Sequence, residues 1–470
     1  MSSIFDNLES HASNIAFQQT NNPDFSYSDL IALSLKILSK LASEEIIIIQ
    51  CSSSIEPIAC YVGCLRHRVV PILLDDQVSV ENLQSFSDLY KARYIFTQTN
   101  KPPEGYKKIL QILDYFIFEN SKYSLKGLIH SELALLITTS GSTGNPKLVK
   151  ISHNNLISNT ESIIKYLSIN PQDKPVTVLP MNYTFGLSVL NTHLYAGATI
   201  VLNNVSILEK SFWQTFEKFH PTSISGVPYT FQMLERLNFF SRGLQNISKV
   251  TQAGGKLSED MVLSIGKQCE EQNIQFYVMY GQSEATARMS YLPPEYTLTK
   301  PSSVGIAIPG GAFWLEDDHG NKIHSANTSG NLIYSGYNVS MGYANSWEDL
   351  SSGDKNMNVL ETGDLAKIDD DGFVYIVGRQ KRFIKIFGNR INLDDIENFF
   401  TQININAAAV GFDDHLILRI EGAKGAHDLL ALKKSVSRFI KVHPSSIKIS
   451  NIDALPRNAS GKLQYNDLAK

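Results

Sequence analysis

Short apolar runs rich in β-branched residues recur between residues 44 and 281. Amphipathic stretches of helical length separate most of them, such as NNLISNTESIIKYLS (154–168). This alternation predicts parallel sheets with helices packed on them, and runs that are apolar throughout suit strands buried on both faces. The runs are EEIIIIQ (44–50), VVPILL (69–74), RYIFTQ (93–98), LALLITT (133–139), PVTVLPM (175–181), ATIVLN (198–203), TSISGVP (222–228) and QFYVMYG (275–281).

The pattern changes after about Gly310. GAFWLEDDHGNKI, GNLIYSGY and DGFVYIVGR are short stretches joined by Asp-Gly or Asn turns, which predicts a smaller antiparallel sheet or distorted barrel. A basic, glycine-punctuated segment follows at 378–390, with enough chain after it for a small α+β domain. We therefore expect an α/β fold with mixed or parallel sheets, divided into an N-terminal domain (1–380) and a C-terminal domain (381–470).

Composition and charge argue against several classes of binding partner and location. The chain has 470 residues and a net charge of −4, which gives no reason to expect nucleic acid or an anionic membrane as a partner. We find no run long enough for a membrane span and no secretion signal in MSSIFDNLESHASN. Cys60 and Cys64 lie four apart in an apolar stretch, and no second pair completes a metal-ligand set. Buried free thiols and a cytoplasmic location are expected.

A polar loop follows the run LALLITT. TTSGSTGNPKLVK (138–150) combines hydroxyl residues, glycines that let the backbone approach an anion, and a lysine. Its spacing differs from that of the GxxxxGK[ST] phosphate loop, so the residues alone leave a phosphate site or a flexible polar turn. Its candidate ligands are Ser140, Gly141, Ser142, Thr143, Gly144 and Lys147.

Three further motifs combine charge with turns. YGQSEAT (280–286) follows a strand, so Glu284 is either a Mg²⁺ ligand beside a nucleotide or an exposed residue that starts a helix. In ETGDLAKIDDDGFVYIVGR, Asp364 and Arg379 flank an expected hairpin, where they either reach one ribose or are ordinary surface charges. In isolation, Lys462 of LPRNASGKLQYNDL is interpreted as a solvated surface lysine.

In this order, the four motifs resemble those of the adenylate-forming superfamily, which includes acyl- and aryl-CoA synthetases, firefly luciferase and the adenylation domains of nonribosomal peptide synthesis. TSGSTGNPK is similar to the family's phosphate-binding loop, YGQSEAT to its YGxTE motif, TGD…GR to its ribose motif, and PRNASGK to its catalytic-lysine loop. The resemblance implies a large N-terminal region and a small mobile C-terminal domain. It also implies ATP- and Mg²⁺-dependent activation of a carboxylic acid to acyl-AMP, then transfer to CoA or carrier-protein phosphopantetheine.

The resemblance also implies a role for each matching residue. The loop residues above would hold the β- and γ-phosphates, Glu284 would bind Mg²⁺, and Lys462 would bridge carboxylate and α-phosphate. Lys381 matches the family's hinge, and Gly388 would line the thiol tunnel. The adenine, α-phosphate and ribose positions are matched by Gly254, Gly255, Lys256, Tyr280, Gly281, Gln282, Ser283, Asp364 and Arg379, with Ser283 in place of the usual Thr.

The acyl pocket departs from the family pattern. FGLSVLN (185–191) resembles the FDxSV segment of amino-acid adenylation domains, but Gly186 stands where their Asp binds the α-ammonium. A buried ammonium without a partner costs several kcal/mol, so an ordinary α-amino acid is disfavoured. The overlapping LPMNYTFGL resembles LPxxHxxGL of CoA synthetases, with Tyr183 replacing His. Tyr183 and Phe185 are interpreted as an apolar or aromatic pocket wall, or as core aromatics.

The sequence does not decide which molecule accepts the acyl group. IKIFGNRINLDDIE looks closer to the carrier-protein branch, Asn331 replaces the family's usual Glu, and AAAVGFDDHLILRIEG (407–422) lacks the usual PDxxxGE-type loop. The leading hypothesis is an AMP-forming acid–thiol ligase, with any carrier protein a separate chain. The alternatives are an enzyme that passes acyl-AMP to a non-thiol acceptor and a non-catalytic nucleotide-binding homologue.

Overall fold

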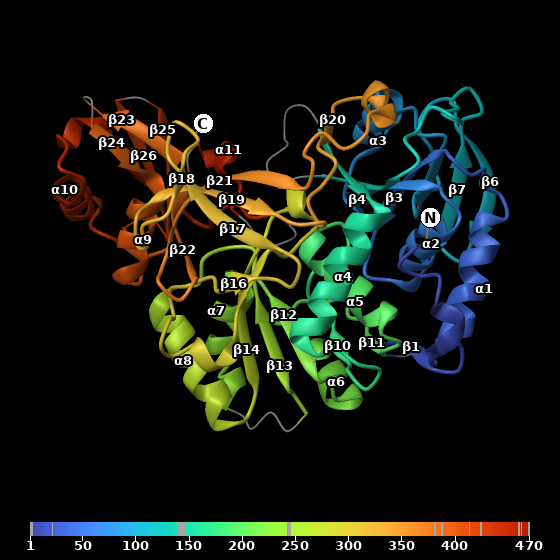
Figure 1. The fold of residues 1–470 in the computed structure, drawn as a ribbon, viewed down its shortest axis with the longest axis horizontal. Coiled ribbons are helices and arrows are strands. Elements are labelled where there is room, and N and C mark those ends of the chain that lie inside the picture. Colours follow the sequence, from blue (N-terminus) through green and yellow to red (C-terminus); the bar gives the residue numbers. More distant parts are fainter. Residues whose placement is uncertain are drawn as a thin grey trace. The chain divides into compact units, whose positions relative to one another are not determined.

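The structure is a computed structural model that describes residues 3–20, 22–138, 147–241, 246–379, 382–386, 389–412, 414–423, 425–458, 461 and 463–468. The chain forms two compact units (Figure 1). The first consists of Met1–Pro301, Gly305–Ala312 and Tyr334–Leu360, and the second of Ser302–Val304, Phe313–Ile333 and Glu361–Lys470. Because the second unit also takes in segments before residue 381, the predicted domain boundary after residue 380 stays a prediction.

The first unit contains an eight-stranded sheet with the order β20-β9-β8-β4-β3-β5-β7-β6. Its centre is parallel, as predicted, and antiparallel strands complete both edges. Every residue of β3 is buried, which confirms a strand covered on both faces. The strands are β3 (Ile46–Cys51), β4 (Val70–Asp75), β5 (Tyr94–Thr97), β6 (Lys107–Ile112), β7 (Tyr115–Glu119), β8 (Leu133–Thr138), β9 (Leu148–Ser152) and β20 (Tyr343–Ala344).

A nine-stranded sheet in the same unit has the order β16-β15-β14-β13-β12-β10-β11-β1-β2. It is parallel from β14 to β1 and antiparallel at both edges. The predicted runs at 175–181 and 198–203 contribute only short strands. The strands are β1 (Ile15–Gln18), β2 (Phe25–Ser26), β10 (Pro175–Val176), β11 (Ile200–Val201), β12 (Ser223–Gly226), β13 (Lys249–Gln252), β14 (Gln275–Tyr280), β15 (Ser290–Leu292) and β16 (Ile306–Ala307).

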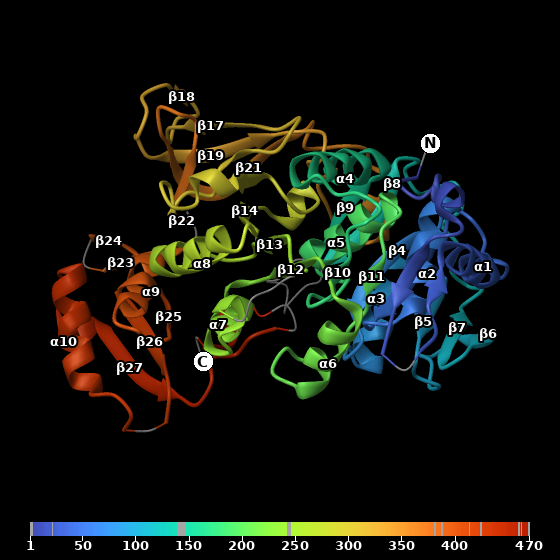
Figure 2. The ribbon, with the colours of Figure 1, turned by 90° about the horizontal axis from the view of Figure 1, so that it is seen from below.

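Helices α4 (His153–Leu167) and α5 (Thr184–Tyr195) lie between the two sheets (Figure 2). On one side, Leu187 of α5 shares a core with residues of β9; on the other, Phe185 shares a core with Met279 of β14. The helix predicted over 154–168 is confirmed as α4, which begins with a capping box at Ser152. The other helices of this unit are α1 (Tyr27–Leu38), α2 (Ile55–Arg66), α3 (Val80–Tyr90), α6 (Lys210–Phe219), α7 (Pro228–Arg236) and α8 (Glu259–Glu271).

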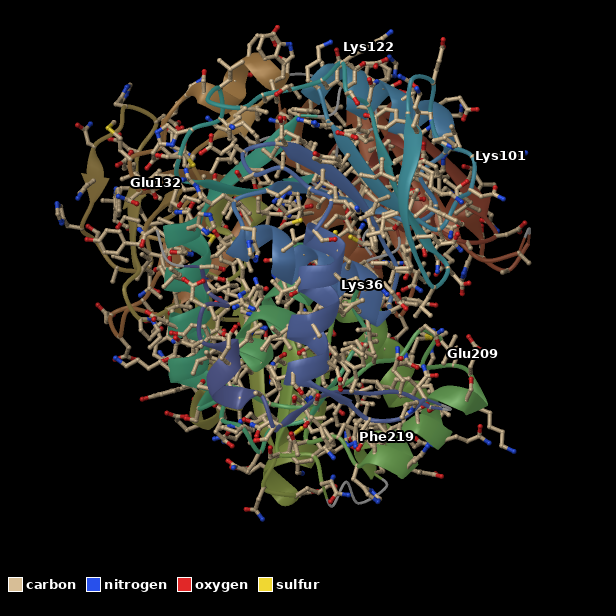
Figure 3. The ribbon with its side chains drawn as sticks, turned by 90° about the vertical axis from the view of Figure 1, so that its right-hand side faces the viewer. Lys36, Lys101, Lys122, Glu132, Glu209 and Phe219 are labelled. Atoms are coloured by element: carbon tan, nitrogen blue, oxygen red, sulfur yellow. The ribbon has the colours of Figure 1, made fainter. Side chains whose placement is uncertain are left out.

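The amphipathic pattern of the helices matches their burial. On the side of the molecule in Figure 3, Lys36 of α1 is exposed, whereas the adjacent Ile37 is buried. All four cysteines are free and buried, and Cys60 and Cys64 lie on α2, which confirms the predicted thiols. Among the described residues, no helix is long and apolar enough to cross a membrane.

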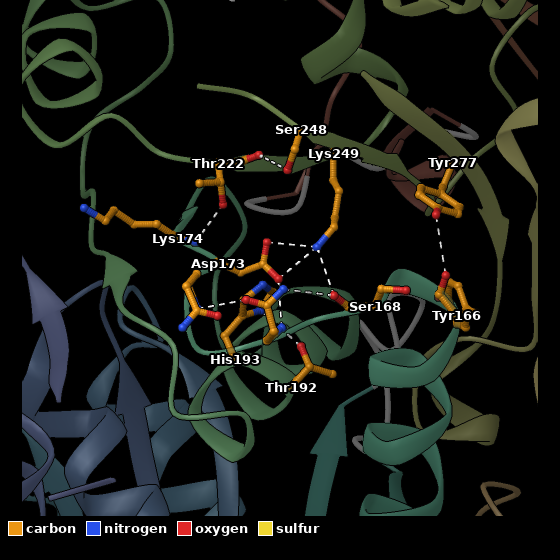
Figure 4. Close-up of polar contacts among 12 residues, drawn as sticks. Tyr166, Ser168, Asp173, Lys174, Thr192, His193, Thr222, Ser248, Lys249 and Tyr277 are labelled. Carbon is orange, nitrogen blue, oxygen red and sulfur yellow. Dashed lines mark hydrogen bonds and ion pairs between the residues drawn. The ribbon is translucent and has the colours of Figure 1, made fainter. Parts of the chain in front are cut away.

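A buried ion pair lies where β13 begins, at the N-terminal edge of the parallel strands. Nζ of Lys249 is 2.9 Å from Oδ1 and 2.8 Å from Oδ2 of Asp173 (Figure 4). Nearby, burial lowers the pKa of His193 to about 4, so its ring is neutral at pH 7. Nδ1 of this histidine lies 2.8 Å from the Val189 carbonyl oxygen. These groups stabilise the edge of the sheet opposite to the loops considered below.

The second unit contains most of a five-stranded sheet, β18-β17-β19-β21-β22, in which β17 with β18 and β21 with β22 are antiparallel pairs. This confirms the predicted antiparallel sheet. The C-terminal part has its own hydrophobic core. Strands β25 and β26 pair up to Phe412 opposite His415, in the stretch whose sequence lacks the PDxxxGE-type loop. The elements are β17 (Ala312–Glu316), β18 (Lys322–Ile323), β19 (Gly330–Ser335), β21 (Val359–Ile368), β22 (Val374–Arg379), β23 (Phe383–Ile386), β24 (Asn389–Asn392), α9 (Leu393–Gln402), β25 (Ala407–Phe412), β26 (His415–Glu421), α10 (Leu429–Ile440), β27 (Ile447–Ile452) and α11 (Tyr465–Leu468).

Candidate active site

Two of the predicted motifs leave neighbouring strands at the same edge of the nine-stranded sheet. β13 and β14 pair in parallel, and the segments Gly254–Lys256 and Gly281–Glu284 follow their C-terminal ends. Gly254 has a φ of +84°, a backbone conformation that favours glycine. The residues predicted for the adenine and phosphate side therefore lie at the edge where α/β sheets bind ligands.

Polar contacts fix the two turns. Nε2 of Gln252, which is buried inside the sheet, donates to the carbonyl oxygen of Gly255 at 2.9 Å. Nε2 of Gln282 lies 3.3 Å from the hydroxyl of Tyr280, which is half-buried, and Lys256 is exposed. Sequence reasoning missed Gln252, because a glutamine at the end of a buried strand has no local signal for its partner three residues on.

The YGQSEAT motif is a tight reversal between β14 and β15. A Cβ atom on Gly281 would lie 1.8 Å from the carbonyl oxygen of Ala287, so glycine is what lets the returning chain pass this close. A single 3₁₀ turn, η3 (Ser283–Ala285), forms the apex. It presents the half-buried side chains of Ser283 and Glu284. Glu284 is therefore half-buried in a short 3₁₀ helix, whereas the alternative interpretation expected an exposed glutamate that starts a helix.

Glu284 and Lys147 both contact one tyrosine that the sequence did not single out. The hydroxyl of Tyr343, in β20, donates to Oε1 of Glu284 at 2.6 Å. Nζ of Lys147 lies 3.7 Å from the centre of the same ring, a cation–π distance. Burial raises the pKa of Tyr343, and the charge of Glu284 raises it further. The phenol therefore keeps its proton and remains a donor.

The carboxylate of Glu284 suits a Mg²⁺ ion that is also coordinated by the phosphates of a nucleotide. Oε2 of Glu284 accepts no hydrogen bond from the residues that the structure describes. Those residues also contain no cluster of three or more His, Cys, Asp or Glu arranged to hold a metal. Mg²⁺ bound with a nucleotide usually takes one or two carboxylates, substrate phosphates and waters. One carboxylate beside a phosphate-type loop suits that mode and does not suit an all-protein metal cage.

Helix α5 brings the predicted acyl-pocket residues next to the Glu284 turn. Oγ1 of Thr184 lies 3.3 Å from Oγ of Ser283. The next residue, Phe185, is buried, and its ring meets that of Tyr183 edge to face, with centroids 6.3 Å apart. Burial raises the pKa of Tyr183, so its phenol is neutral. Thr184 thus links the hydroxyl of Ser283, which is predicted to lie at the α-phosphate, to the aromatic residues.

Gly186 is required by packing. A Cβ atom there would lie 2.3 Å from the carbonyl oxygen of Pro180 and 2.9 Å from that of Leu179. Both are backbone atoms, so an aspartate at this position would need the segment before α5 to move. The glycine therefore has a structural cause, which the sequence argument about a missing ammonium partner did not include.

In the second unit, the hairpin β21–β22 aligns the predicted ribose-binding residues. Asp364 lies directly opposite Arg379 in antiparallel register, and Nε of Arg379 is 3.4 Å from Oδ1 of Asp364. The side chain of Asp364 is 4% exposed and that of Arg379 is 63% exposed. The predicted hairpin is confirmed, and residues opposite each other in register share one face of the sheet.

Comparison with known proteins identifies the family. Residues 9–344 match the family described as AMP-binding enzyme. The chain belongs to this family. This AMP-binding enzyme is 27% identical over 395 residues to oxalate–CoA ligase of Saccharomyces cerevisiae, covering 78% of this chain and 69% of the relative. It is 25% identical over 466 residues to 2-succinylbenzoate–CoA ligase of Bacillus subtilis, covering 94% and 92%.

Two solved structures share the fold of this AMP-binding enzyme. The B. subtilis O-succinylbenzoate coenzyme A synthetase in complex with AMP has a TM-score of 0.79 at 21% identity and covers 100% of this chain and 98% of that one. ATP-bound MatB from Rhodopseudomonas palustris has a TM-score of 0.78 at 20% identity, covering 99% and 98%. The predicted α/β fold and the predicted superfamily are confirmed.

Several residues predicted for this AMP-binding enzyme lie outside the described residues. For two of the motifs, the structure describes the residues on either side. β8 and β9 pair as far as Thr138 opposite Leu148, on either side of the phosphate loop. Nη1 of Arg457 donates to the carbonyl oxygen of Gly461 at 3.0 Å, in the lysine loop. The predicted residues outside the described part of the chain are Ser140, Gly141, Ser142, Thr143, Gly144, Lys381, Gly388 and Lys462.

Proposed function

We propose that this AMP-binding enzyme uses ATP to convert a carboxylic acid into an acyl-AMP and then transfers the acyl group to the thiol of CoA. The contact between Ser283 and Thr184 carries the proposal. It joins the turn expected at the α-phosphate to the helix expected along the acid, so a carboxylate beside α5 would lie next to the α-phosphorus. The CoA ligases among the relatives support the same reaction.

In the first step, a carboxylate oxygen attacks the α-phosphorus, the bond to the oxygen that bridges to the β-phosphate breaks, and pyrophosphate leaves. Both reactants are anionic, so the site must supply donors and positive charge. Ser283 would donate to the α-phosphate, Lys147 would hold the departing phosphates, and Lys462 would lie between carboxylate and phosphate. Asp364 would accept hydrogen bonds from the ribose hydroxyls. Mg²⁺ held by Glu284 neutralises phosphate charge when bound.

In the second step, the sulfur of the thiol attacks the acyl carbon, the bond from that carbon to the AMP oxygen breaks, and the thiol proton leaves to solvent. Rotation at Lys381 would withdraw Lys462, and Gly388 would line the path of the thiol. Carrier-protein phosphopantetheine is the alternative acceptor, with the carrier a separate chain. The cytoplasmic location stays a prediction.

The test is incubation of the purified chain with ATP, Mg²⁺ and a panel of acids, followed by mass spectrometry for acyl-AMP and assay of pyrophosphate. CoA and a loaded carrier protein are then added separately, and the thioester is measured. Glu284→Gln should abolish Mg²⁺-dependent adenylation. The control Glu295→Gln removes the charge of an exposed glutamate eleven positions further along the chain and should leave adenylation unchanged. ATP binding without acyl-AMP from any acid would favour the non-catalytic homologue, and acyl-AMP without thioester would favour a non-thiol acceptor.

A further inference from the structure

Arg288 is buried beside the predicted acyl-pocket residues and has no carboxylate partner among the residues that the structure describes. The residue is 2% exposed. Nε donates to Oγ of Ser188 at 3.2 Å, and Nη1 lies 3.3 Å from the hydroxyl of Tyr166 and 3.6 Å from Sδ of Met279. The guanidinium also lies over the ring of Phe185, 5.0 Å from its centre. No carboxylate of the described residues lies within 4.0 Å of it.

None of these neighbours neutralises the guanidinium. Serine, methionine and phenylalanine carry no charge. Burial raises the pKa of Tyr166, and Arg288 only partly opposes this, so the phenol is neutral too. Of the two other buried cations among the described residues, Lys249 contacts Asp173, and Lys150 donates to the carbonyl oxygens of Asp349 and Ser352 and to the Ser352 hydroxyl. Burying a charge without a counter-ion is costly, and Arg288, unlike Lys150, has a terminal nitrogen with no partner among the described residues. An anion beside that nitrogen would therefore be stabilising.

The backbone holds Arg288 in place. Its carbonyl oxygen accepts from Nδ2 of Asn159 at 2.9 Å and from Nδ2 of Asn338 at 3.2 Å. Asn338 also donates to the Ala285 carbonyl oxygen at 2.9 Å and accepts from the hydroxyl of Tyr334 at 2.8 Å. Two amides from distant segments thus fix the turn that carries the arginine. Such a preorganised position is what a binding residue needs.

The guanidinium retains donors that a ligand can use. Nη2 donates to no partner among the described residues, and it is not one of the fully enclosed unpaired atoms. Nη2 can donate a charge-assisted hydrogen bond to a carboxylate oxygen. Arg288 contacts Phe185, and the adjacent Thr184 contacts Ser283 at the phosphate side. The free donors therefore lie close to the acyl end of the site.

We propose that Arg288 binds a second carboxylate of the substrate, so that the acid activated by this enzyme is a dicarboxylic acid. This rests on the proposed function, because it names the acid that the adenylation step uses. One carboxylate attacks the α-phosphorus and the other pairs with Arg288. An α-amino acid would place its ammonium near an uncompensated guanidinium, which adds repulsion to the exclusion already inferred from Gly186.

The test compares diacids with partners that lack only the second charge. Succinate, glutarate, adipate and isophthalate are each paired with their monomethyl ester, and kcat/KM for pyrophosphate release is measured. The wild type should prefer at least one diacid over its ester by about 10²-fold, since leaving a buried charge unpaired costs that much or more. Arg288→Met should lose this preference, and Arg288→Lys should retain part of it. Arg236→Met removes an exposed arginine of α7 and should match the wild type.

A second readout does not depend on turnover. The diacid that reacts best should raise the Tm of the wild type and of Arg236→Met but not that of Arg288→Met. Equal turnover of diacids and esters by the wild type, or a preference that survives in Arg288→Met, would overturn the role of Arg288 while leaving the proposed function intact. If no acid of either kind yields an adenylate, the proposed function fails, and this inference fails with it.

Discussion

Gly186→Ala is expected to lower the free energy of unfolding, although alanine normally favours a helix. Gly186 lies in the first turn of α5, where replacing glycine by alanine ordinarily adds about 1 kcal/mol. Here the new Cβ would be 2.3 Å from the carbonyl oxygen of Pro180 and 2.9 Å from that of Leu179. Overpacking against atoms that cannot swing aside costs about 3 kcal/mol. The clash outweighs the helix gain, and the net loss is expected to be about 2 kcal/mol.

The assay is urea unfolding of the wild type, Gly186→Ala and the matched control Gly63→Ala. Gly63 also lies within a helix, α2, but its Cβ would first meet the side-chain end of Leu38, at 2.8 Å. That side chain can rotate, so this variant should lie much closer to the wild type. The reasoning is refuted if Gly186→Ala is as stable as the wild type, or if the control is destabilised more.

Four further results are expected from the site and the fold. Lys462→Ala should slow adenylation about 10²–10³-fold but spare thioester formation from supplied acyl-AMP; equal losses in single-turnover kinetics of the two steps would contradict this. Asp364→Ala should weaken nucleotide binding, and therefore both steps, in the same measurements. Replacing Ser142 and Thr143 together by Ala should raise the KM for ATP, and unchanged ATP kinetics in the folded variant would remove the loop from the site. Asp173→Asn leaves a buried ammonium unpaired and should cost about 3–5 kcal/mol in urea unfolding with the KM for ATP unchanged; a loss below about 1 kcal/mol would contradict the pairing.

Local pattern predicted much of the framework. Runs such as EEIIIIQ became buried central strands because continuous apolarity is needed on both faces of a covered sheet, and α4 starts at a serine cap that the sequence displays. The run PVTVLPM formed only β10, Pro175–Val176, although it has the composition of a longer strand. Its later residues, Leu179 and Pro180, pack against Gly186 at the start of α5. The hydrophobic pattern of the run does not predict this contact.

The residues that complete the candidate site depend on contacts between distant segments. Tyr343 reaches Glu284 across 59 positions, and Asn338 reaches Ala285 across 53. Neither residue stands out in its own stretch, because tyrosine and asparagine are common in loops and edges. Arg288 did carry a signal, a lone charge in ATARMSYL just before a buried strand. The motifs alone drew attention to the glutamate four residues earlier and left this arginine aside.

The pairing of β8 with β9 has a consequence for engineering. Thr138 and Leu148 are register partners, so the segment 139–147 begins and ends roughly 5 Å apart, at two points fixed by the sheet. We expect a replacement of similar length between these points to leave the register of the two strands unchanged. We therefore expect that the segment predicted to bind phosphate can be exchanged as a unit. A chimera that receives the corresponding loop of another family member is expected to change the affinity for ATP without redesign of the core. A library of variants confined to this segment would vary ATP binding while the two strands stay the same.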